Sequence, residues 1–506
     1  MNAPPSPLLL LIDIDGLRPD VFRAALAAGK LPNLAGLLGG PDLARGTIIP
    51  ATAPAPSITF CSQACLFTGA HPKDHGIPGN QFFDRFGTYD GDGRHRGIPQ
   101  FFAFDVGDTL EVDDAVRVFT DGLAAQRLMA ETFYERMAAQ GKTCVVAGNM
   151  YAKGAQTWIK PSLANIARFT KGGNLFGMSS REYDEDILTR LLAHLKQGLP
   201  DVLTLYFMGL DHDSHHYGPA HGQMPYLVDH VDPMIGKLLH TIHHSQFLIP
   251  NSPFLVSIFS DHGQIEVIPD DPHSLRLGFP FDKEVGDFFT ALGLDVHDYP
   301  GEDPACDAVM ALNGGTASVY LQKKDGHWAE PPLFERDVRP VARAFWQAHA
   351  TGKYAPELRG ALAGVLVRNV ERDGWEAPFA ALTPDGDLLP LPDWFATQPD
   401  GLYLDPVHRL NNQTGLFSGD LLLISNYAGG YYFGKEIHGV HGGLHPEDSH
   451  ATLAYGCPGA DAEEWPRMKA AIEEAIAARC AAEGGRMPST CDLVVGVEAG
   501  IQLNMD

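Results

Sequence analysis

The chain has 506 residues and a formal net charge of −26, because 63 acidic residues stand against 37 basic ones. Such an acidic surface repels a polyphosphate backbone, which excludes a long nucleic acid as partner but leaves a small anion able to bind beside metal ions. Apolar residues make up 44% of the chain and charged residues 20%. This is typical of a soluble globular protein with one large core carrying insertions, or with two domains.

The N-terminal apolar run is short and leads into acidic residues. Residues 8–12 have no basic flank and no small-residue cleavage site, so they predict a buried strand and not a signal peptide. No stretch approaches the roughly 20 apolar residues that span a bilayer. We therefore expect no membrane association, and the cytoplasm is the expected compartment.

The first half of the chain alternates between predicted strands and helices. Apolar runs predict the strands, and apolar positions three and four apart predict the helices. The expected strands are residues 8–13, 47–50, 143–147, 202–207 and 254–259, and the expected helices are residues 21–28, 57–67, 122–140, 183–197 and 228–243. This alternation predicts an α/β fold whose mainly parallel sheet is covered by helices on both faces.

The pattern loosens in the second half of the chain. Residues 265–418 are rich in Pro, Gly and Asp and contain shorter elements. Core-like strands are expected to return at residues 420–425 and 451–455, followed by a helix at 465–482 and a final strand at 491–497. We therefore predict a catalytic core from residues 1–264 and 419–506, with residues 265–418 inserted as a lobe over the active-site edge that sets substrate choice.

Four short segments hold an unusual density of Asp and His. They are residues 13–16, 211–216, 260–263 and 438–445, and most of them follow a predicted strand. Active sites of open α/β sheets form where parallel strands end. A single Asp there is usually a turn or cap residue, but burying all these groups together costs several kcal/mol unless an ion compensates. Carboxylate and imidazole together predict zinc or a similar divalent metal.

Residues 55–69 offer a nucleophile at the start of a predicted helix. A hydroxyl group there, from Ser57 or Thr59, would lie beside the positive end of the helix dipole. A metal contact would lower its pKa further, so that the alkoxide can attack phosphorus. On this segment alone an N-cap is the better interpretation. Cys61 and Cys65 share one face of this helix and are interpreted as buried apolar residues, and the seven cysteines show no disulfide framework.

Five motifs stand in a characteristic order between residues 13 and 455. They are Asp15-Gly16 after the first strand, Thr59 ahead of Leu66-Phe67-Thr68-Gly69 and His75-Gly76-Ile77-Pro78-Gly79-Asn80, Asp211 with His215, Ser260-Asp261-His262-Gly263, and His441-Gly442. Together these motifs resemble the nucleotide pyrophosphatase/phosphodiesterase branch of the alkaline phosphatase superfamily. Each motif is modest alone, but their order over nearly the whole chain makes the resemblance specific.

The resemblance implies an alkaline-phosphatase-like core with two divalent metal ions, zinc in the first place and manganese as the alternative. One metal site would be formed by Asp211, His215 and His441, and the other by Asp15, Asp261, His262 and the Thr59 oxygen. Asn80 and the backbone amide of Thr59 would bind a phosphate oxygen, and Phe60 would contact the substrate.

Two positions depart from the family pattern. The Pro-Asn-His that often follows the nucleophile is missing here, so Ser57 stays an alternative to Thr59. The last cluster also offers His438, His445 and His450, and His441 is preferred because two glycines follow it.

The resemblance predicts a hydrolase of phosphodiester or nucleotide pyrophosphate bonds that forms a phosphoryl-threonine intermediate. The alternative is a phosphonate hydrolase with a substrate such as phosphonoacetate, and a phosphomutase is less favoured. Lys153 follows a predicted strand and would face a substrate carboxylate or phosphate, unless it is a solvated surface lysine. A binding module that keeps the fold without catalysis is the contrasting class, and the complete ligand set argues against it. The expected partner is a small phosphate- or phosphonate-containing substrate.

Overall fold

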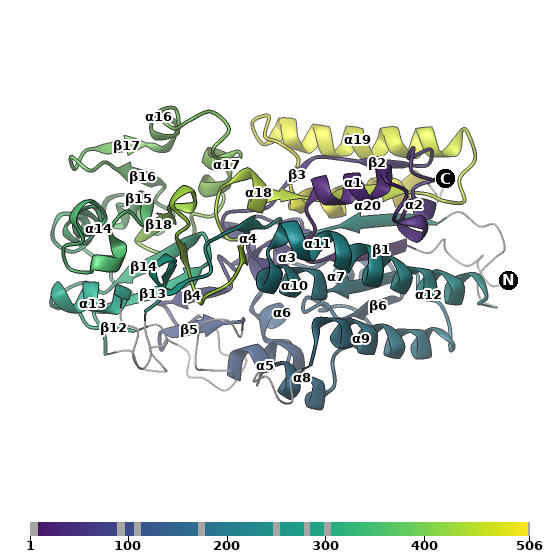
Figure 1. Cartoon of the computed structure of the whole chain (residues 1–506), viewed down its shortest axis with the longest axis horizontal. Helices are drawn as coiled ribbons and strands as arrows, with labels where there is room; N and C mark the ends of the chain where they lie inside the picture. The colour runs from purple at the N-terminus through teal and green to yellow at the C-terminus, as the bar shows by residue number, and fades with distance from the viewer. Residues whose placement is uncertain are drawn as a thin grey trace.

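Two seven-stranded sheets lie beside each other along the long axis of the molecule (Figure 1). The computed structural model describes residues 9–88, 97–105, 113–170, 178–245, 254–277, 284–297 and 305–503. The first sheet holds the N-terminal strands and forms the right-hand part of Figure 1, and the second sheet forms the left-hand part. We call these parts the core and the lobe.

The core sheet is mainly parallel. Its strand order is β2-β22-β9-β1-β8-β6-β7, in which the five strands from β9 to β7 run parallel and β22 and β2 join antiparallel at one edge. The strands are β1 (Leu9–Ile14), β2 (Gly46–Ile48), β6 (Cys144–Ala147), β7 (Thr157–Ile159), β8 (Val202–Phe207), β9 (Leu255–Phe259) and β22 (Leu453–Gly456). The mainly parallel sheet predicted from the sequence is confirmed.

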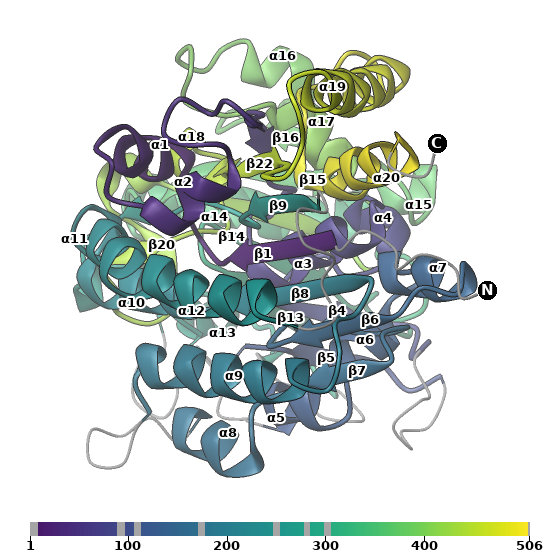
Figure 2. The same ribbon diagram turned by 90° about the vertical axis from the view of Figure 1, so that its right-hand side faces the viewer.

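Helices cover both faces of the core sheet (Figure 2). Along β1, Leu9 and Leu11 pack on one face, and Leu10 and Ile12 pack on the other. This is why the strand is apolar throughout and does not alternate with polar residues. The first face carries α3 (Thr59–Thr68), α7 (Phe133–Ala139), α19 (Glu464–Ala482) and α20 (Leu493–Leu503), and the second carries α1 (Pro19–Ala27), α2 (Pro32–Leu37), α9 (Ser180–Leu195) and α12 (Asp232–His243).

The lobe sheet is mainly antiparallel, with the order β12-β13-β14-β18-β15-β16-β17. Its strands are β12 (Val296–His297), β13 (Ala308–Asn313), β14 (Thr316–Leu321), β15 (Leu362–Arg368), β16 (Phe379–Leu382), β17 (Leu388–Pro390) and β18 (Leu421–Ser425). Helices α13 (Glu284–Ala291) and α14 (Arg339–Thr351) pack on this sheet.

The expected return to the core at residues 420–425 is wrong, because β18 lies in the middle of the lobe sheet. Side chains of β18 are buried on both faces, with Leu421 and Leu423 on one and Leu422 and Ile424 on the other. Such an apolar run fits the centre of either sheet, so its pattern cannot say which sheet it joins. The lobe therefore extends past residue 418, and the chain rejoins the core sheet at β22.

Two further elements differ from their predictions. The helix expected at 122–140 is interrupted between α6 (Leu123–Arg127) and α7, because Thr132 and Glu135 form a capping box that starts a new helix. The strand expected at 491–497 is instead the beginning of α20. Its valines favour a strand, but a capping box between Ser489 and Asp492 starts a helical turn there. Within the described ranges, no helix is both long and apolar enough to cross a membrane.

Candidate active site

The predicted ligands gather where the parallel strands of the core sheet end. Asp15 follows β1 directly, and its backbone N–H donates to the last carbonyl of β8 at 2.9 Å. Helix α10 (Gly209–Tyr217) begins just after β8 and carries Asp211 and His215 one turn apart. Asp261 and His262 follow β9. Side chains from three neighbouring strands therefore meet at one edge of the sheet, next to the lobe.

Gly16 makes a close approach between two of these segments. It adopts φ +67°, and a Cβ atom at this position would lie 2.7 Å from Asp211 Oδ1. Its backbone N–H also donates to Asp261 Oδ1 at 3.1 Å. A side chain would push the loop after β1 away from Asp211, so the Asp-Gly pair of the first motif has a physical reason.

Asp211, His215 and His441 form the first group of ligands. His441 comes from the loop after β20 (Gly439–Val440), at the end of the lobe. The candidate ligand atoms of the three residues all lie within 4.8 Å of one another. His215 Nε2 is 3.0 Å from Asp211 Oδ2 and 3.2 Å from His441 Nε2. This is the first site implied by the resemblance.

Asp15, Asp261 and His262 form the second group, and Thr59 lies against it. His262 Nε2 is 3.5 Å from Asp15 Oδ1, 3.4 Å from Asp261 Oδ2 and 3.2 Å from Thr59 Oγ1. Asp211 also lies within 4.8 Å of Asp15 and His262, so it borders both groups. Asp15 Oδ1 and Asp261 Oδ2 are buried and accept no hydrogen bond within the described part of the chain.

The three histidines are oriented as metal ligands by the backbone. Nδ1 of His215, His262 and His441 lies 2.6, 2.9 and 3.2 Å from the carbonyl oxygens of Gly439, Gly263 and Ser57 respectively. Each ring donates its Nδ1–H to a carbonyl, which leaves the Nε2 lone pair directed toward the carboxylates. Converging imidazole lone pairs and unpaired carboxylate oxygens are the donor set that a divalent cation such as zinc requires.

The charge balance of this edge also fits bound cations. Burial and the neighbouring Asp261 and Asp211 raise the pKa of Asp15 well above its ordinary value. Burial and the nearby His262 lower the pKa of His441, so this ring stays neutral and able to bind a metal. For Asp211, the charge of the adjacent His215 outweighs burial and lowers the pKa. Carboxylates this close together repel one another unless positive charge is placed between them.

Thr59 is the first residue of α3, so its hydroxyl lies at the N-terminal end of the helix. The next backbone amide, that of Phe60, donates to Asn80 Oδ1 at 2.9 Å. The Asn80 amide nitrogen donates to Asp105 Oδ2 at 3.4 Å. The lobe fixes this loop, because Asn313 Oδ1 accepts from the backbone N–H of Asn80 at 2.8 Å.

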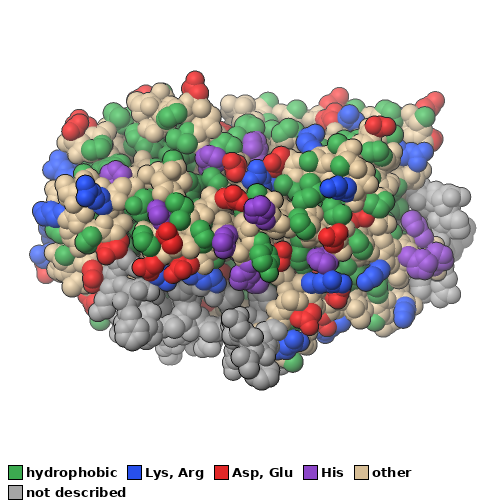
Figure 3. All heavy atoms as spheres, viewed as in Figure 1, with side chains coloured by type: hydrophobic (Ala, Val, Ile, Leu, Met, Phe, Trp, Pro, Cys, Tyr) green, Lys and Arg blue, Asp and Glu red, His purple; other side chains and the backbone are tan. Residues whose placement is uncertain are grey.

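A cavity of about 250 Å³ opens beside these residues. Thr59, Asn80 and the first ligand group line it. The rest of the wall is mainly apolar and includes Phe60, Phe104, Phe119, Ile166 and Met208. The lobe side contributes Leu312, Gly314, Phe433, Gly434, Lys435 and Ile437. The side chains of this cavity can hold a small anion with an apolar substituent. In Figure 3, histidine and acidic side chains gather near the middle of the face, where core and lobe meet.

Not every predicted site residue lies at the cavity. The structure does not place Lys153 at the substrate, as one expectation had it. Its ammonium pairs with Glu135 at 3.3 Å, its side chain is 43% exposed, and it is not among the lining residues. Ser57 is also turned away, because its Oγ donates to Gly443 O at 3.0 Å and accepts from Gly442 N at 3.2 Å. His438 is exposed, whereas His441 joins the ligands.

Sequence reasoning missed two residues that hold the ligands in place. The Tyr206 hydroxyl donates to Asp15 Oδ2, and Gln264 Nε2 donates to Asp211 Oδ1 at 2.7 Å. Gln264 directly follows Ser260-Asp261-His262-Gly263, and this adjacency is a signal that could have identified it. Tyr206 lies inside β8, where a tyrosine is ordinary, so nothing in the pattern marked it.

Known proteins with similar sequences indicate the same kind of enzyme as the motifs do. The sequence model of the family described as type I phosphodiesterase / nucleotide pyrophosphatase matches residues 9–340. The chain belongs to this family. It is therefore a phosphoric ester hydrolase with an alkaline-phosphatase-like fold, of a family whose members are typically metal-dependent.

Curated relatives match over short stretches. The human GPI ethanolamine phosphate transferase 2 catalytic subunit is 25% identical over 169 residues, which are 33% of this chain and 16% of that protein. The mouse GPI ethanolamine phosphate transferase 3 catalytic subunit is 25% identical over 142 residues, 28% of this chain and 12% of that protein. The match thus spans less than a fifth of these relatives' length.

Solved structures match over most of the chain. Murine ectonucleotide pyrophosphatase / phosphodiesterase 5 has a TM-score of 0.51 and 14% identity, with 89% of this chain and 88% of that chain covered. Phosphonoacetate hydrolase from Sinorhizobium meliloti 1021, in complex with phosphonoformate, has a TM-score of 0.51 and 16% identity, with 98% and 97% covered. At these identities the likeness shows a shared fold.

Proposed function

We propose that the protein hydrolyses phosphodiester or nucleotide pyrophosphate bonds with two divalent cations, zinc in the first place, and that Thr59 carries the phosphoryl intermediate. The observation that supports this most strongly is the convergence of the three Nε2 lone pairs on unpaired carboxylate oxygens beside Thr59 Oγ1. A small phosphate- or phosphonate-containing compound is the proposed substrate. The cytoplasmic location expected from the sequence stays a prediction.

Asp211, His215 and His441 would hold one cation, and Asp15, Asp261, His262 and Thr59 would hold the other. The chemistry that such cations supply when bound is Lewis-acid stabilisation of the Thr59 alkoxide and of the leaving-group oxygen. The nucleophile and the groups that bind and orient the phosphate are side chains and backbone groups of this chain.

Thr59 would attack phosphorus, forming a bond between Oγ1 and phosphorus while the bond to the leaving group breaks. The positive end of α3 favours the negative charge that gathers there. Asn80, fixed by the Phe60 and Asn313 hydrogen bonds, would donate its Nδ2–H to an equatorial phosphate oxygen. Hydrolysis of the phosphoryl-threonine by water then restores the free hydroxyl.

The structural neighbours are consistent with a small anionic substrate. An inactive threonine-to-alanine variant of the murine phosphodiesterase was solved in complex with AMP. The bacterial phosphonoacetate hydrolase was solved with phosphonoformate and with phosphonoacetate. The second candidate function, phosphonate hydrolysis, is favoured by Lys435, which among the described lining residues carries the one ammonium or guanidinium group. Its charge suits a substrate carboxylate.

The decisive experiment compares Thr59→Ala with Ser57→Ala on diester, nucleotide pyrophosphate, monoester and phosphonate substrates, with zinc added. We expect Thr59→Ala to lower kcat by at least about 10³-fold, since it removes the nucleophile. Ser57→Ala should keep most of its turnover, because this hydroxyl bonds only to the backbone of residues 442 and 443 in the described structure. Acid-quenched wild-type enzyme should carry the phosphoryl group on Thr59, and with a diester or nucleotide pyrophosphate substrate this group should still bear the remaining ester substituent. If Ser57→Ala is the inactive variant, or phosphate is found on another residue, the proposed nucleophile is wrong.

A further inference from the structure

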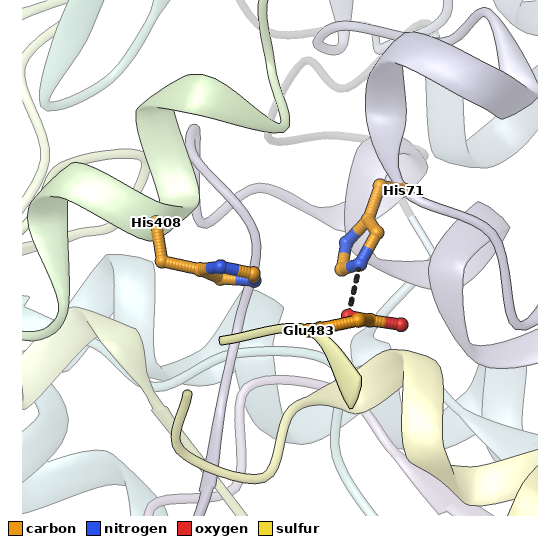
Figure 4. A group of neighbouring side chains, drawn as sticks. All are labelled: His71, His408 and Glu483. Carbon is orange, nitrogen blue, oxygen red and sulfur yellow. Dashed lines mark hydrogen bonds and ion pairs between the residues drawn. The ribbon is translucent and has the colours of Figure 1, made fainter. Parts of the chain in front are cut away.

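A second group of ionisable side chains lies where α3 ends and the lobe meets the C-terminal segment. His71 caps α4 (Pro72–His75), His408 lies on α17 (Pro406–Asn411) of the lobe, and Glu483 follows α19 (Figure 4). Their candidate ligand atoms lie within 4.8 Å of one another. None of them is among the described residues that line the active-site cavity.

His71 connects Glu483 to Cys491. Its Nε2 lies 2.9 Å from Glu483 Oε2, and its Nδ1 lies 3.5 Å from Cys491 Sγ. Although burial opposes it, the charges of Cys491 and Glu483 raise the pKa of His71 to about 9. Both ring nitrogens therefore carry protons at neutral pH, and His71 is a cation placed between a carboxylate and a sulfur atom.

This arrangement opposes a metal ion. Glu483 accepts from Arg479 at 2.9 Å and from Arg486 at 2.6 Å, so two guanidinium groups already neutralise the carboxylate. A divalent cation would have to displace the His71 proton and sit beside both arginines. The spacing of the three ligand atoms resembles that of a metal site. The positive charges of His71 and the two arginines instead favour negative charge on the neighbouring Cys491 sulfur.

Cys65 completes the arrangement from the other side. Ile77 N–H donates to His75 Nδ1 at 3.1 Å, so His75 carries its proton on Nε2 and donates it to Cys65 Sγ at 3.3 Å. Cys491 Sγ lies 3.2 Å from Ala70 O. The Cys65 thiol hydrogen-bonds with the Cys491 sulfur where α3 packs against the turn at Thr490–Asp492. This hydrogen bond, with the charges of His71 and Arg479, lowers the pKa of Cys491 well below its ordinary value despite burial. Burial and the same hydrogen bond raise the pKa of Cys65.

The two sulfur atoms are therefore unequal, because the pKa of Cys491 lies below its ordinary value and the pKa of Cys65 lies above it. Such asymmetry is what thiol–disulfide chemistry uses, because the thiolate reacts with an electrophile and the neighbouring thiol then resolves the product. Cys491 is 2% exposed. His71, whose Nδ1 lies against the Cys491 sulfur, is partly exposed.

We propose that Cys491 and Cys65 form a hydroperoxide-reactive pair that closes into a disulfide. In the first step the Cys491 thiolate attacks the peroxide: an S–O bond forms, the O–O bond breaks, sulfur is oxidised to a sulfenic acid and the peroxide is reduced. The departing alkoxide or hydroxide takes the Nδ1 proton of His71. In the second step the Cys65 sulfur attacks Cys491, the S–O bond breaks, and the thiol proton leaves with the hydroxyl group as water. The product links α3, which begins at Thr59, to the C-terminal segment.

Among the described residues, the titratable and charged groups near the pair are His71, His75, Arg479, Glu483, Arg486 and Asp492. Of these, His71 donates a proton to Cys491, so it is the residue whose removal should slow the first step. His71→Gln keeps a hydrogen-bonding side chain without the charge. Cys61→Ser is the matched control for Cys65→Ser, because Cys61 lies one turn earlier on the same helix and is equally buried.

The test treats the full-length, metal-loaded protein with hydrogen peroxide, then counts free thiols under denaturing conditions and maps disulfides by mass spectrometry. We expect the count to fall from seven to five, with Cys65 linked to Cys491, in the wild type and in Cys61→Ser. Cys65→Ser should form no disulfide, and His71→Gln should react at least about tenfold more slowly. Seven surviving thiols, or a disulfide between other cysteines, would overturn the proposal.

A measurement on the unaltered protein guards against variants that fail to fold. The rate of thiol loss with peroxide should stay within about twofold between pH 6.5 and 8, because the reacting sulfur is already a thiolate. An ordinary buried thiol would instead react about tenfold faster for each pH unit in this range. That steep rise would contradict the proposal whatever the variants show.

Discussion

Two groups of His and carboxylate side chains in this molecule have similar spacing and opposite chemistry. At the active-site edge, each histidine gives its Nδ1 proton to a backbone carbonyl and keeps a free Nε2 lone pair. At the junction with the C-terminal segment, His71 donates from both nitrogens, and two arginines hold Glu483. Distances between candidate ligand atoms do not separate a metal site from an ion-pair network. A metal site and an ion-pair network are instead distinguished by the partner of the second ring nitrogen and by the charges around the carboxylate.

Removing one histidine from each group tests most directly whether only the active-site group binds metal. We expect His441→Ala to lose bound divalent metal and to lower kcat/KM by on the order of 10³-fold, because several kcal/mol of Lewis-acid stabilisation depend on the ligand. His408→Ala should keep the wild-type metal content and activity within about twofold. Elemental analysis of purified protein and steady-state kinetics measure both quantities. Metal loss from His408→Ala would show that the second group also binds a cation.

The hydrogen bond from Tyr206 to Asp15 should have the next largest effect. Tyr206→Phe removes the donor that orients this carboxylate, and such partners of metal ligands typically change metal affinity by roughly 10- to 100-fold. Zinc titration against a competing chelator measures the affinity. Tyr134→Phe is a suitable control, since this buried hydroxyl bonds to Thr204 away from the ligands. Equal affinities in the two variants would mean that Tyr206 does not position Asp15.

The pH dependence of stability tests the charges of the second group. The raised pKa of His71, about 9 against an ordinary 6.5, gives stability that is complete below pH 6.5 and is lost as the pH rises through 9. The lowered pKa of Cys491 has the opposite sign, because its contribution is present above the ordinary value of 9.0 and is lost as the pH falls. Between pH 6.5 and 9 the folded pair and the unfolded pair hold equal numbers of protons, so the two slopes cancel.

Cys491→Ser removes the cysteine slope and also the larger of the two charges that raise the pKa of His71, so only the histidine slope due to Glu483 should remain. We expect the free energy of unfolding of this variant, relative to the wild type, to fall by less than about 1 kcal/mol per pH unit as the pH rises above 6.5. Urea denaturation at three pH values between 6.5 and 9 measures it. A difference that does not change with pH would show that Glu483 alone does not keep His71 charged.

The smallest effect is expected at His438. It is close to His441 in the sequence, but its side chain is exposed and lies outside both ligand groups. His438→Ala should leave metal content and kcat/KM within about twofold of the wild type. A loss comparable to that of His441→Ala would mean that the wrong histidine of this segment has been assigned.

The sequence was most informative where a short motif follows a strand. Asp15, Asp211 and Asp261 could be placed at one sheet edge because parallel strands end there together. Lys153 also follows a strand, but its ion pair with Glu135 depends on the path of the next loop, which no local pattern specifies. The same limit applies to β18, whose apolar run suits the centre of either sheet.

The second group shows a different limit. His71, His408 and Glu483 come from three elements far apart in the chain, and none of them belongs to a motif. Cys61 and Cys65 were interpreted as buried apolar residues, and both are buried. Only the folded structure brings Cys65 to Cys491 and places His71 beside it. Contacts of this kind arise from packing between helices and cannot be read from periodicity.

The most direct test of the account is a crystal structure of the zinc-loaded protein with data recorded at the zinc absorption edge. We predict two anomalous peaks per chain, one among Asp211, His215 and His441 and one among Asp15, Asp261, His262 and Thr59. No peak should appear between His71, His408 and Glu483. A peak at that second group, or the absence of a peak from either active-site group, would contradict the claim that the ring-nitrogen partners decide where metal binds.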